Sequence, residues 1–301
     1  MILVCRETEG KVYTEPFSKG ILSRSLIMAE MDPSESYALA NKIESDLLEN
    51  GITSISIEDL VKRIVELLEE ENPLLAENYL NWRKIRNTDQ PLIILIGGVS
   101  GVGTSSISYE ISRKLGIKSM INTDMIREVM RKILSKELSP VIHESSFIAH
   151  KALRVSPPPE FDHVLAGFKD HVATVSVGVE AVIERALTEG ISIIIEGVHI
   201  VPGFIRKDLL EKDNVLMFTL TLSDEETHRN RLYSRCRDGW GHRPLQKYLD
   251  NFDSIRRIQK YFTDQSEIEG VPNIDNMDRL STIDFIINSI AEQYGALNNK
   301  D

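Results

Sequence analysis

A glycine-rich run that begins at Gly98 has the residue types and spacing of a phosphate-binding loop. The run Gly98-Val-Ser-Gly-Val-Gly-Thr-Ser105 matches G-x-x-x-x-G-K-[ST] at every defined position except the lysine, where Thr104 stands. Glycines let backbone N–H groups approach a ligand closely, and the helix pattern that follows adds a partial positive charge at its N-terminus. A polyphosphate is therefore the expected ligand, and the residues predicted to bind it are Gly98, Ser100, Gly101, Val102, Gly103, Thr104, Ser105 and Ser106. The alternative is a glycine-rich turn that binds nothing.

Two side chains near this loop are candidate magnesium ligands. The hydroxyl of Ser105 stands where the motif places such a ligand. Glu196 ends the apolar run 193–195, and a carboxylate there is costly to bury unless it is paired or serves a cation. His199 follows three residues later and is a candidate for substrate binding, although a lone histidine beside a strand end is more often structural.

The segment around Asp124 is a candidate site for an acceptor molecule. Asp124 stands where a predicted strand passes into a helix, and ligands of open α/β sheets collect at the carboxyl ends of the strands. We predict that Asp124 accepts a hydroxyl proton or orients the acceptor. Arg127 and Arg131 lie four residues apart on one helix face and could bind a carboxylate or phosphate. The alternative is an N-capping aspartate followed by two solvated arginines.

A basic helix is a candidate source of the positive charge that the missing lysine would supply. After a capping box predicted at residues 223–226, His228, Arg231 and Arg235 share one face, and a glycine-rich turn follows at 238–241. Such a helix suits a lid that closes on the transferred phosphoryl group, with Arg231 and Arg235 in a catalytic role. The alternative is a solvated charged helix.

The composition limits the class of protein. The chain has 301 residues, of which 42% are hydrophobic and 27% charged, and its net charge of −11 argues against nucleic acid as the main partner. We see no membrane-spanning run and no signal peptide. The two cysteines, Cys5 and Cys236, suggest neither a metal site nor a disulfide framework. We therefore expect a cytoplasmic protein that does not bind membranes.

The elements that must position these residues fall into two domains. Residues 1–90 are predicted to form a small, mostly helical α+β domain: a hairpin (2–6 and 11–16) and helices at 19–29, from 32 towards 51, from 56 onward and at 74–86. Residues 91–301 are predicted to form an α/β domain with a doubly wound parallel sheet. The pattern gives a helix at 105–115 after the loop, and strands at 119–122, 191–196 and 215–222, with a short one near 268–271.

The N-terminal domain resembles the ATP-cone, a small regulatory nucleotide-binding module. The resemblance rests on residues 12–21, Ser25-Leu26 and residues 79–86. If the domain binds nucleotide, Lys11, Lys19 and Arg24 are the charges to consider. The alternative is a small packing domain without a ligand.

The chain as a whole resembles the 2-phosphoglycerate kinases of methanogenic archaea. The resemblance rests on residues 97–105, 122–127, 195–199 and 247–252 together with 255–259, a run read as a helix carrying Arg256 and Arg257. It implies a P-loop kinase domain behind an ATP-cone-like domain. The implied reaction is ATP- and Mg²⁺-dependent phosphorylation of the 3-hydroxyl of 2-phosphoglycerate to 2,3-bisphosphoglycerate, towards cyclic 2,3-diphosphoglycerate.

Two other functions stay open from the residues. One is a kinase of a different small acceptor, and loss of Arg127 would matter sharply only if the acceptor is anionic. The other is a non-catalytic nucleotide sensor, which would bind ATP without turnover and tolerate Asp124→Asn. The N-terminal domain is also a candidate contact for a homo-oligomer.

Overall fold

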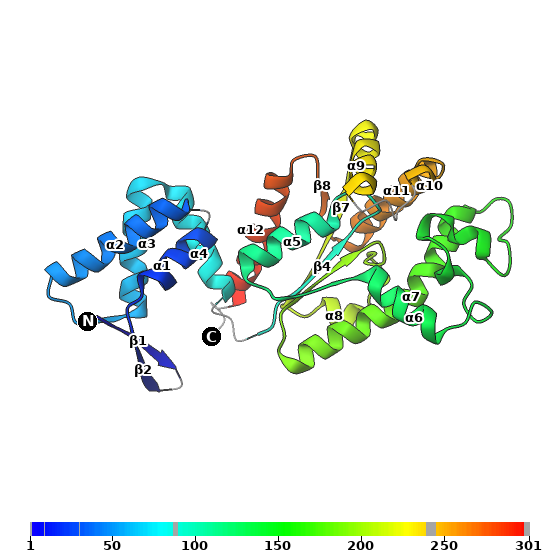
Figure 1. Ribbon diagram of the computed structural model, residues 1–301. Coiled ribbons are helices and arrows are strands. Elements are labelled where there is room, and N and C mark those ends of the chain that lie inside the picture. Colours follow the sequence, from blue (N-terminus) through cyan, green and yellow to red (C-terminus); the bar gives the residue numbers. More distant parts are fainter. Residues whose placement is uncertain (1, 9, 30, 87–89, 239–244, 298–301) are drawn as a thin grey trace. The chain divides into compact units, whose positions relative to one another are not determined.

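The computed structural model describes all residues except 1, 9, 30, 87–89, 239–244 and 298–301 (Figure 1). The chain divides into two units, Met1–Asn87 and Thr88–Asp301, and the division falls within the polar stretch before Pro91. Each unit has its own hydrophobic core.

The first unit combines a three-stranded sheet with four helices. Strands β1 (Leu3–Thr8) and β2 (Lys11–Pro16) form the predicted antiparallel hairpin, and β3 (Ser54–Ser56) pairs with β1 in parallel. Strand β3 was not predicted, because three residues with serines at both ends carry no strand periodicity. The predicted helices are present, namely α1 (Lys19–Met28), α2 (Pro33–Glu49), α3 (Ile57–Glu71) and α4 (Pro73–Arg86). Side-chain caps begin these helices: Ser18 accepts from the backbone N–H of Ile21, Asp32 from that of Ser34, Ser56 from that of Asp59 and Asn72 from that of Leu74.

The second unit is built on a five-stranded, all-parallel sheet. Its strand order is β5-β6-β4-β7-β8, formed by β4 (Ile93–Gly97), β5 (Ser119–Asn122), β6 (Ile193–Gly197), β7 (Val215–Thr221) and β8 (Asn273–Asp275). This confirms the predicted α/β class with a doubly wound parallel sheet. One strand prediction is wrong: residues 268 and 269 belong to a helix that ends at Gly270, and the strand begins only at Asn273. The apolar pattern favours a strand at Ile268, but its side chain is 70% exposed on that helix.

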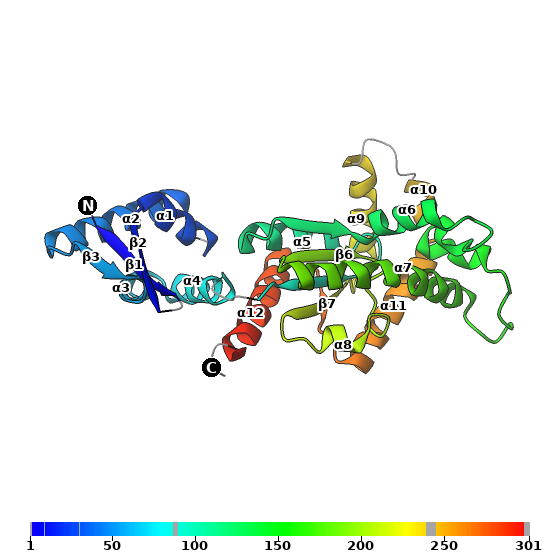
Figure 2. The ribbon, with the colours of Figure 1, turned by 90° about the horizontal axis from the view of Figure 1, so that it is seen from below.

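Helices cover both faces of this sheet. They are α5 (Thr104–Leu115), α6 (Thr123–Ile133), α7 (His163–Glu189), α8 (Lys207–Leu210), α9 (Glu225–Asp238), α10 (Leu245–Leu249), α11 (Phe252–Glu269) and α12 (Arg279–Leu297), with the short 3-10 helices η1 (Val141–His143) and η2 (Ser146–Ala152). The predicted helix around residues 247–259 is thus two helices, separated at Asp250 and Asn251. Strand residues Leu95, Ile195 and Met217 pack in one core with apolar side chains of α6, α7 and α8. Helices α5 and α12 lie on the opposite face (Figures 1 and 2).

Helix α7 packs so closely on η2 that Gly167 has no room for a side chain. A Cβ atom at this position would lie 2.2 Å from the backbone nitrogen of His150 and 2.3 Å from its Cα atom. At Gly178, on the same helix, a Cβ would meet the side chains of Ile126 and Met130. Side-chain tips can move aside, whereas the backbone of η2 cannot shift without disturbing its packing.

We therefore expect Gly167→Ala to lower the free energy of unfolding of the second unit by about 1–3 kcal/mol. The matched variant Gly178→Ala should cost less, because alanine also favours the helix by about 1 kcal/mol over glycine. Denaturant unfolding followed by circular dichroism measures both. Equal stabilities of the two variants would contradict this account of the α7–η2 contact.

Candidate active site

The phosphate-binding loop joins the end of β4 to the start of α5. Strand β4 is fully buried through Gly97, and α5 begins at Thr104, so the loop is held between two fixed elements. Gly101 and Gly103 have φ angles of +95° and +100°, which side-chain-bearing residues rarely adopt. The glycines predicted to bind phosphate are therefore also the residues that allow the loop its shape.

Glu196 lies at the centre of the site and joins the loop to two strands. Its carboxylate is 2% exposed and accepts hydrogen bonds from Thr104 Oγ1 (2.7 Å to Oε2) and Ser105 Oγ (2.9 Å to Oε1). Asn122 Nδ2 also donates to Oε1. The sheet register explains the meeting, because Glu196 on β6 lies opposite Ile96 on β4 and Asn122 on β5. The residue that replaces the motif lysine therefore donates a hydrogen bond to the predicted magnesium ligand.

Asp124 stands at the carboxyl end of β5, in the first turn of α6. Its backbone N–H donates to the side chain of Asn122, which caps the helix. The Asp124 side chain is 49% exposed and pairs with Arg127, whose Nε lies 3.2 Å from Oδ1. Arg127 Nη1 also donates to the backbone carbonyls of Ile142 and Glu144. Asp124 and Arg127 thus come together, while Arg131 pairs with Glu128 at 2.7 Å one turn further on.

His199 is fully buried and supports the start of α6. Its Nδ1 lies 2.7 Å from Thr123 Oγ1, and its ring stacks on that of His171 with 5.0 Å between the centroids. Burial and the nearby Arg127 lower the pKa of His199 to about 3, and burial also holds the pKa of His171 well below its ordinary value. Both imidazoles are therefore neutral at pH 7. Direct contact between His199 and a substrate stays a prediction.

Arg231 contacts the outer side of the phosphate-binding loop. Its guanidinium donates to the backbone carbonyls of Val102 (3.4 Å), Asn276 (2.7 Å) and Met277 (3.3 Å). Asn276 Nδ2 donates to the same Val102 carbonyl at 2.7 Å. Arg235 lies on α9, but its side chain is outside the described residues, as is most of the glycine-rich turn at 238–241.

The start of α9 differs from the prediction. The backbone N–H of Thr227 donates to Asp224 Oδ1 at 2.7 Å, so Asp224 caps the helix in place of the predicted Ser223. The backbone N–H of Ser223 instead donates to Asp275 Oδ1, which fixes Ser223 to the end of β8.

The chain is closely similar to proteins of one enzyme family over nearly its whole length. A 2-phosphoglycerate kinase of Methanothermobacter thermautotrophicus is 60% identical over 292 residues, which are 97% of this chain and 95% of that protein. The chain belongs to the 2-phosphoglycerate kinase family. Two further members are the 2-phosphoglycerate kinases of Methanopyrus kandleri, 44% identical over 95% of this chain and 86% of that protein, and of Pyrococcus furiosus, 40% identical over 95% and 93%. The ATP cone domain family matches residues 9–88.

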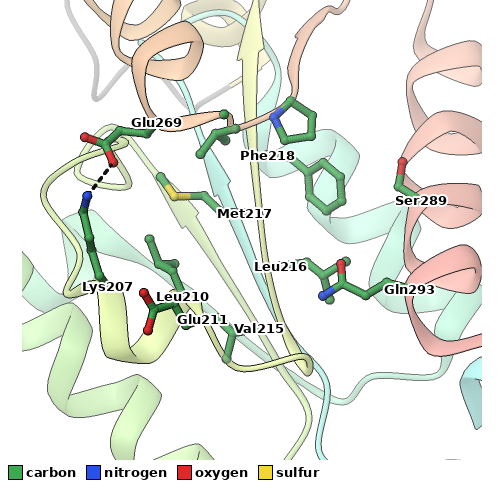
Figure 3. Close-up of a pocket in the computed structure, with 13 residues that line it drawn as sticks. Lys207, Leu210, Glu211, Val215, Leu216, Met217, Phe218, Glu269, Ser289 and Gln293 are labelled. Carbon is green, nitrogen blue, oxygen red and sulfur yellow. Dashed lines mark ion pairs between the residues drawn. The ribbon is translucent and has the colours of Figure 1, made fainter. Parts of the chain in front are cut away.

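Family membership confirms the resemblance found in the sequence. A pocket of about 420 Å³ lies elsewhere, around the first residues of β7, with Lys207, Glu269 and Gln293 on its wall (Figure 3). Lys207 and Glu269 form an ion pair across part of it at 3.7 Å. None of the predicted site residues lines this pocket, so it is separate from the candidate site.

The donor set around Glu196 fits a magnesium ion. Mg²⁺ prefers oxygen ligands and commonly takes one or two from the protein and the rest from phosphates and water. Ser105 and Glu196 offer two such oxygens 2.9 Å apart. Within the described part of the chain, no group of three His, Cys, Asp or Glu side chains is placed to hold a metal ion.

Sequence reasoning missed several residues of this candidate site. Asn122 lies in the segment 122–127, on which the family resemblance rests, but it was given no role, although a polar residue at the carboxyl end of a strand is a usable signal. Thr123 and His171 gave no signal, since their contacts depend on how α6 and α7 cross. Asn276 directly follows β8 and donates a hydrogen bond to the Val102 carbonyl of the loop, a contact between distant segments that the sequence does not reveal.

Proposed function

We propose that this chain transfers the γ-phosphoryl group of ATP to the 3-hydroxyl of 2-phosphoglycerate. The product is 2,3-bisphosphoglycerate, on the way to cyclic 2,3-diphosphoglycerate. The observation that carries the proposal is the 60% identity, over nearly the whole of both chains, to a protein named for this activity. No helix within the described residues has the length and apolar character of a membrane span, and we place the reaction in the cytoplasm.

The proposed ATP site is the phosphate-binding loop. The N–H groups of residues 98–106 and the N-terminus of α5 would bind the phosphates. Ser105 and Glu196 would hold magnesium, which supplies positive charge to the β- and γ-phosphate oxygens when it is bound. Thr104 and Asn122 keep the Glu196 carboxylate in place through their hydrogen bonds.

The proposed acceptor site lies at the end of β5. Asp124 would orient the 3-hydroxyl or accept its proton, and its half-exposed carboxylate is accessible for this role. Arg127 would bind an anionic group of the acceptor while its Nη1 stays on the backbone of residues 142 and 144. Arg131 and His199 stay proposed as further acceptor residues. An acceptor with both a carboxylate and a phosphate suits a site that holds several arginines.

The charge of the missing lysine is assigned, as a proposal, to Arg231 and Arg235. Arg231 is engaged with three backbone carbonyls, so it would have to release at least one of them to reach a phosphate. Arg235 stands one helical turn further along α9. Phosphoryl transfer depends mainly on positioning and on stabilising negative charge. Two arginines and magnesium supply the same kind of positive charge as a lysine.

We propose that the N-terminal domain is a regulatory nucleotide-binding module. It comprises residues 1–90, including the connecting helix, and precedes the kinase domain, which comprises residues 91–301. The match to the ATP cone domain family supports this. Of its candidate charges, Lys19 pairs with Glu44 at 2.9 Å, so a nucleotide would compete with that pair. A homo-oligomer formed through this domain is also proposed.

The test is turnover by the full chain with ATP and Mg²⁺, with 2-phosphoglycerate as acceptor and 3-phosphoglycerate as control, followed by ³¹P NMR of the products. We expect 2,3-bisphosphoglycerate only from 2-phosphoglycerate. Turnover with another acid but not with 2-phosphoglycerate would replace the acceptor and keep the kinase. ATP binding without turnover with any acceptor would favour the nucleotide sensor.

A further inference from the structure

His228 on helix α9 binds the phosphate-binding loop directly. Its Nε2 lies 2.8 Å from the backbone carbonyl oxygen of Ser100, and its ring is fully buried. The loop packs against the same helix, since a Cβ atom on Gly101 would lie 2.9 Å from Cδ2 of His228. The ring of Phe252 meets the imidazole edge-on, with 5.2 Å between the centroids. His228 is therefore a fixed contact between α9 and the loop.

The partners of the two ring nitrogens determine the protonation state of His228. A carbonyl oxygen only accepts, so Nε2 must carry a hydrogen and donate it to Ser100. Nδ1 lies 3.5 Å from Nη1 of Arg256, and a guanidinium only donates, so Nδ1 must be unprotonated. His228 is thus the neutral Nε2–H tautomer.

Arg256 is itself fixed at the end of β7. Its Nη1 donates to the carbonyl of Leu222 at 2.6 Å and its Nη2 to that of Ser223 at 3.0 Å, while Nε lies 3.5 Å from Glu225. Gln259, one turn along α11, exchanges two hydrogen bonds with the backbone of Leu222. The hydrogen bonds of Arg256 to the backbone therefore hold its guanidinium in place beside Nδ1 of His228.

We propose that His228, held as its neutral Nε2–H tautomer by Arg256, is a positioning residue that keeps the phosphate-binding loop in its ATP-binding shape. A carbonyl held on the outer side of the loop leaves the neighbouring N–H groups free to point to the phosphates. Asn276 and Arg231 hold the Val102 carbonyl in the same way, so the loop is fixed at two points. The proposal rests on the proposed ATP-binding function of the loop.

The charges around His228 give the contact a pH dependence. The pKa of His228 lies below its ordinary value of 6.5, because the ring is buried and because Arg256 and Arg231 are close; the Ser100 carbonyl and Glu225 act in the opposite direction. The pKa of His228 is lower in the folded protein than in the unfolded chain, so neutral His228 contributes its full stability above pH 6.5. This contribution is lost as the pH falls through the lower, folded-state pKa. Protonated Nδ1 would face the Arg256 donor, so the contact should weaken on acidification.

The experiment uses three substitutions in the full chain. His228→Phe keeps a ring against Phe252 but removes both hydrogen bonds, whereas His228→Gln can still donate to Ser100 and accept from Arg256. Arg256→Met keeps much of the side-chain stem and removes the guanidinium. The first measurement is hydrogen–deuterium exchange of peptides covering residues 98–105, with and without MgATP. This reads binding at the loop alone, even if the N-terminal domain also binds nucleotide and even without turnover.

We expect His228→Phe and Arg256→Met each to raise the ATP concentration that half-protects the loop by about three- to tenfold, the effect of one or two lost hydrogen bonds. His228→Gln should stay near wild type, and the double variant that combines His228→Phe with Arg256→Met should lose less than the product of the single effects. The KM for ATP should rise in parallel while kcat changes less. Loop protection equal to wild type in His228→Phe, or equal losses in His228→Phe and His228→Gln, would overturn the proposal.

A pH titration of loop protection distinguishes the positioning role of His228 from a general structural role. Lowering the pH below 6.5 should weaken loop protection by MgATP in the wild type, and His228→Gln should remove this dependence, while the buried His171 and His199 are present in both proteins. An unchanged pH dependence in His228→Gln would overturn the tautomer argument. If the loop shows no protection by MgATP in any variant, wild type included, the proposed function of the loop fails rather than the role of His228.

Discussion

Glu196→Gln should lower kcat/KM by about 10²–10³-fold, the loss typical of removing one preorganised electrostatic group from an active site. The buried carboxylate of Glu196 accepts from Thr104, Ser105 and Asn122, so it is oriented before any ligand arrives. Glutamine keeps the size but replaces one of the two acceptor oxygens by a donor amide, which would face either the Thr104 hydroxyl or the pair formed by the Ser105 hydroxyl and the Asn122 amide. The magnesium concentration for half-maximal rate should therefore also rise, by about 10- to 100-fold.

The measurement is a magnesium titration of the initial rate with saturating ATP and 2-phosphoglycerate. Glu189→Gln is the matched control, since Glu189 is an exposed partner of Arg185 on α7 and its loss should leave both quantities unchanged. Circular dichroism must show that Glu196→Gln is folded, because a buried group with unsatisfied partners also reduces stability. A folded variant with wild-type magnesium dependence would remove Glu196 from the metal site.

The arrangement around Thr104 bears on why a loop without the motif lysine can still serve a kinase. The Thr104 hydroxyl donates to the Glu196 carboxylate at 2.7 Å. Threonine orients the same carboxylate without a charge, which leaves Glu196 available to magnesium.

The sequence predicts most of the sheet and the residues at its carboxyl edge, because those signals are local. Residues 119–122 were predicted as a strand with the observed bounds, and Asp124 was placed correctly at the following strand–helix junction. The partners of the two arginines on α6 were less predictable. Arg127 and Arg131 share a helix side by spacing, yet Arg127 turns to Asp124 and Arg131 to Glu128, since i,i+3 partners were available to both.

Contacts between distant segments could not be predicted from one sequence. The hydrogen bonds from Thr104 and Asn122 to Glu196 depend on the strand order that places β6 between β5 and β4. The hydrogen bond from Arg231 to the Asn276 carbonyl also depends on β8, which ends at the residue before Asn276 and which was predicted too early in the chain. Spacing gave Arg256 no role, because its partners Leu222, just after β7, and His228, on α9, are 34 and 28 residues away in sequence.

Asp124→Asn should lower kcat by about 10²–10⁴-fold if Asp124 accepts the hydroxyl proton. Asparagine preserves the shape and can still accept from Arg127 Nε, and the cap of α6 is unaffected because Asn122 provides it. The KM for ATP should therefore change little. If Asp124 only orients the acceptor, the asparagine variant should retain more activity, since phosphoryl transfer through a loose transition state needs little base assistance.

The measurement is steady-state kinetics with 2-phosphoglycerate varied at saturating MgATP, compared with Asp264→Asn, which makes the same change at the exposed partner of Lys260 on α11. The control should keep kcat, because its pair is on the surface and contributes little. A loss confined to kcat in Asp124→Asn makes Asp124 a group that acts on the reacting hydroxyl, whereas a loss mainly in the KM for 2-phosphoglycerate makes it an acceptor-binding group. Wild-type kinetics in Asp124→Asn would exclude both roles and move the acceptor away from the end of β5, since this carboxylate pairs with Arg127 at the edge of the sheet where the acceptor is proposed to bind.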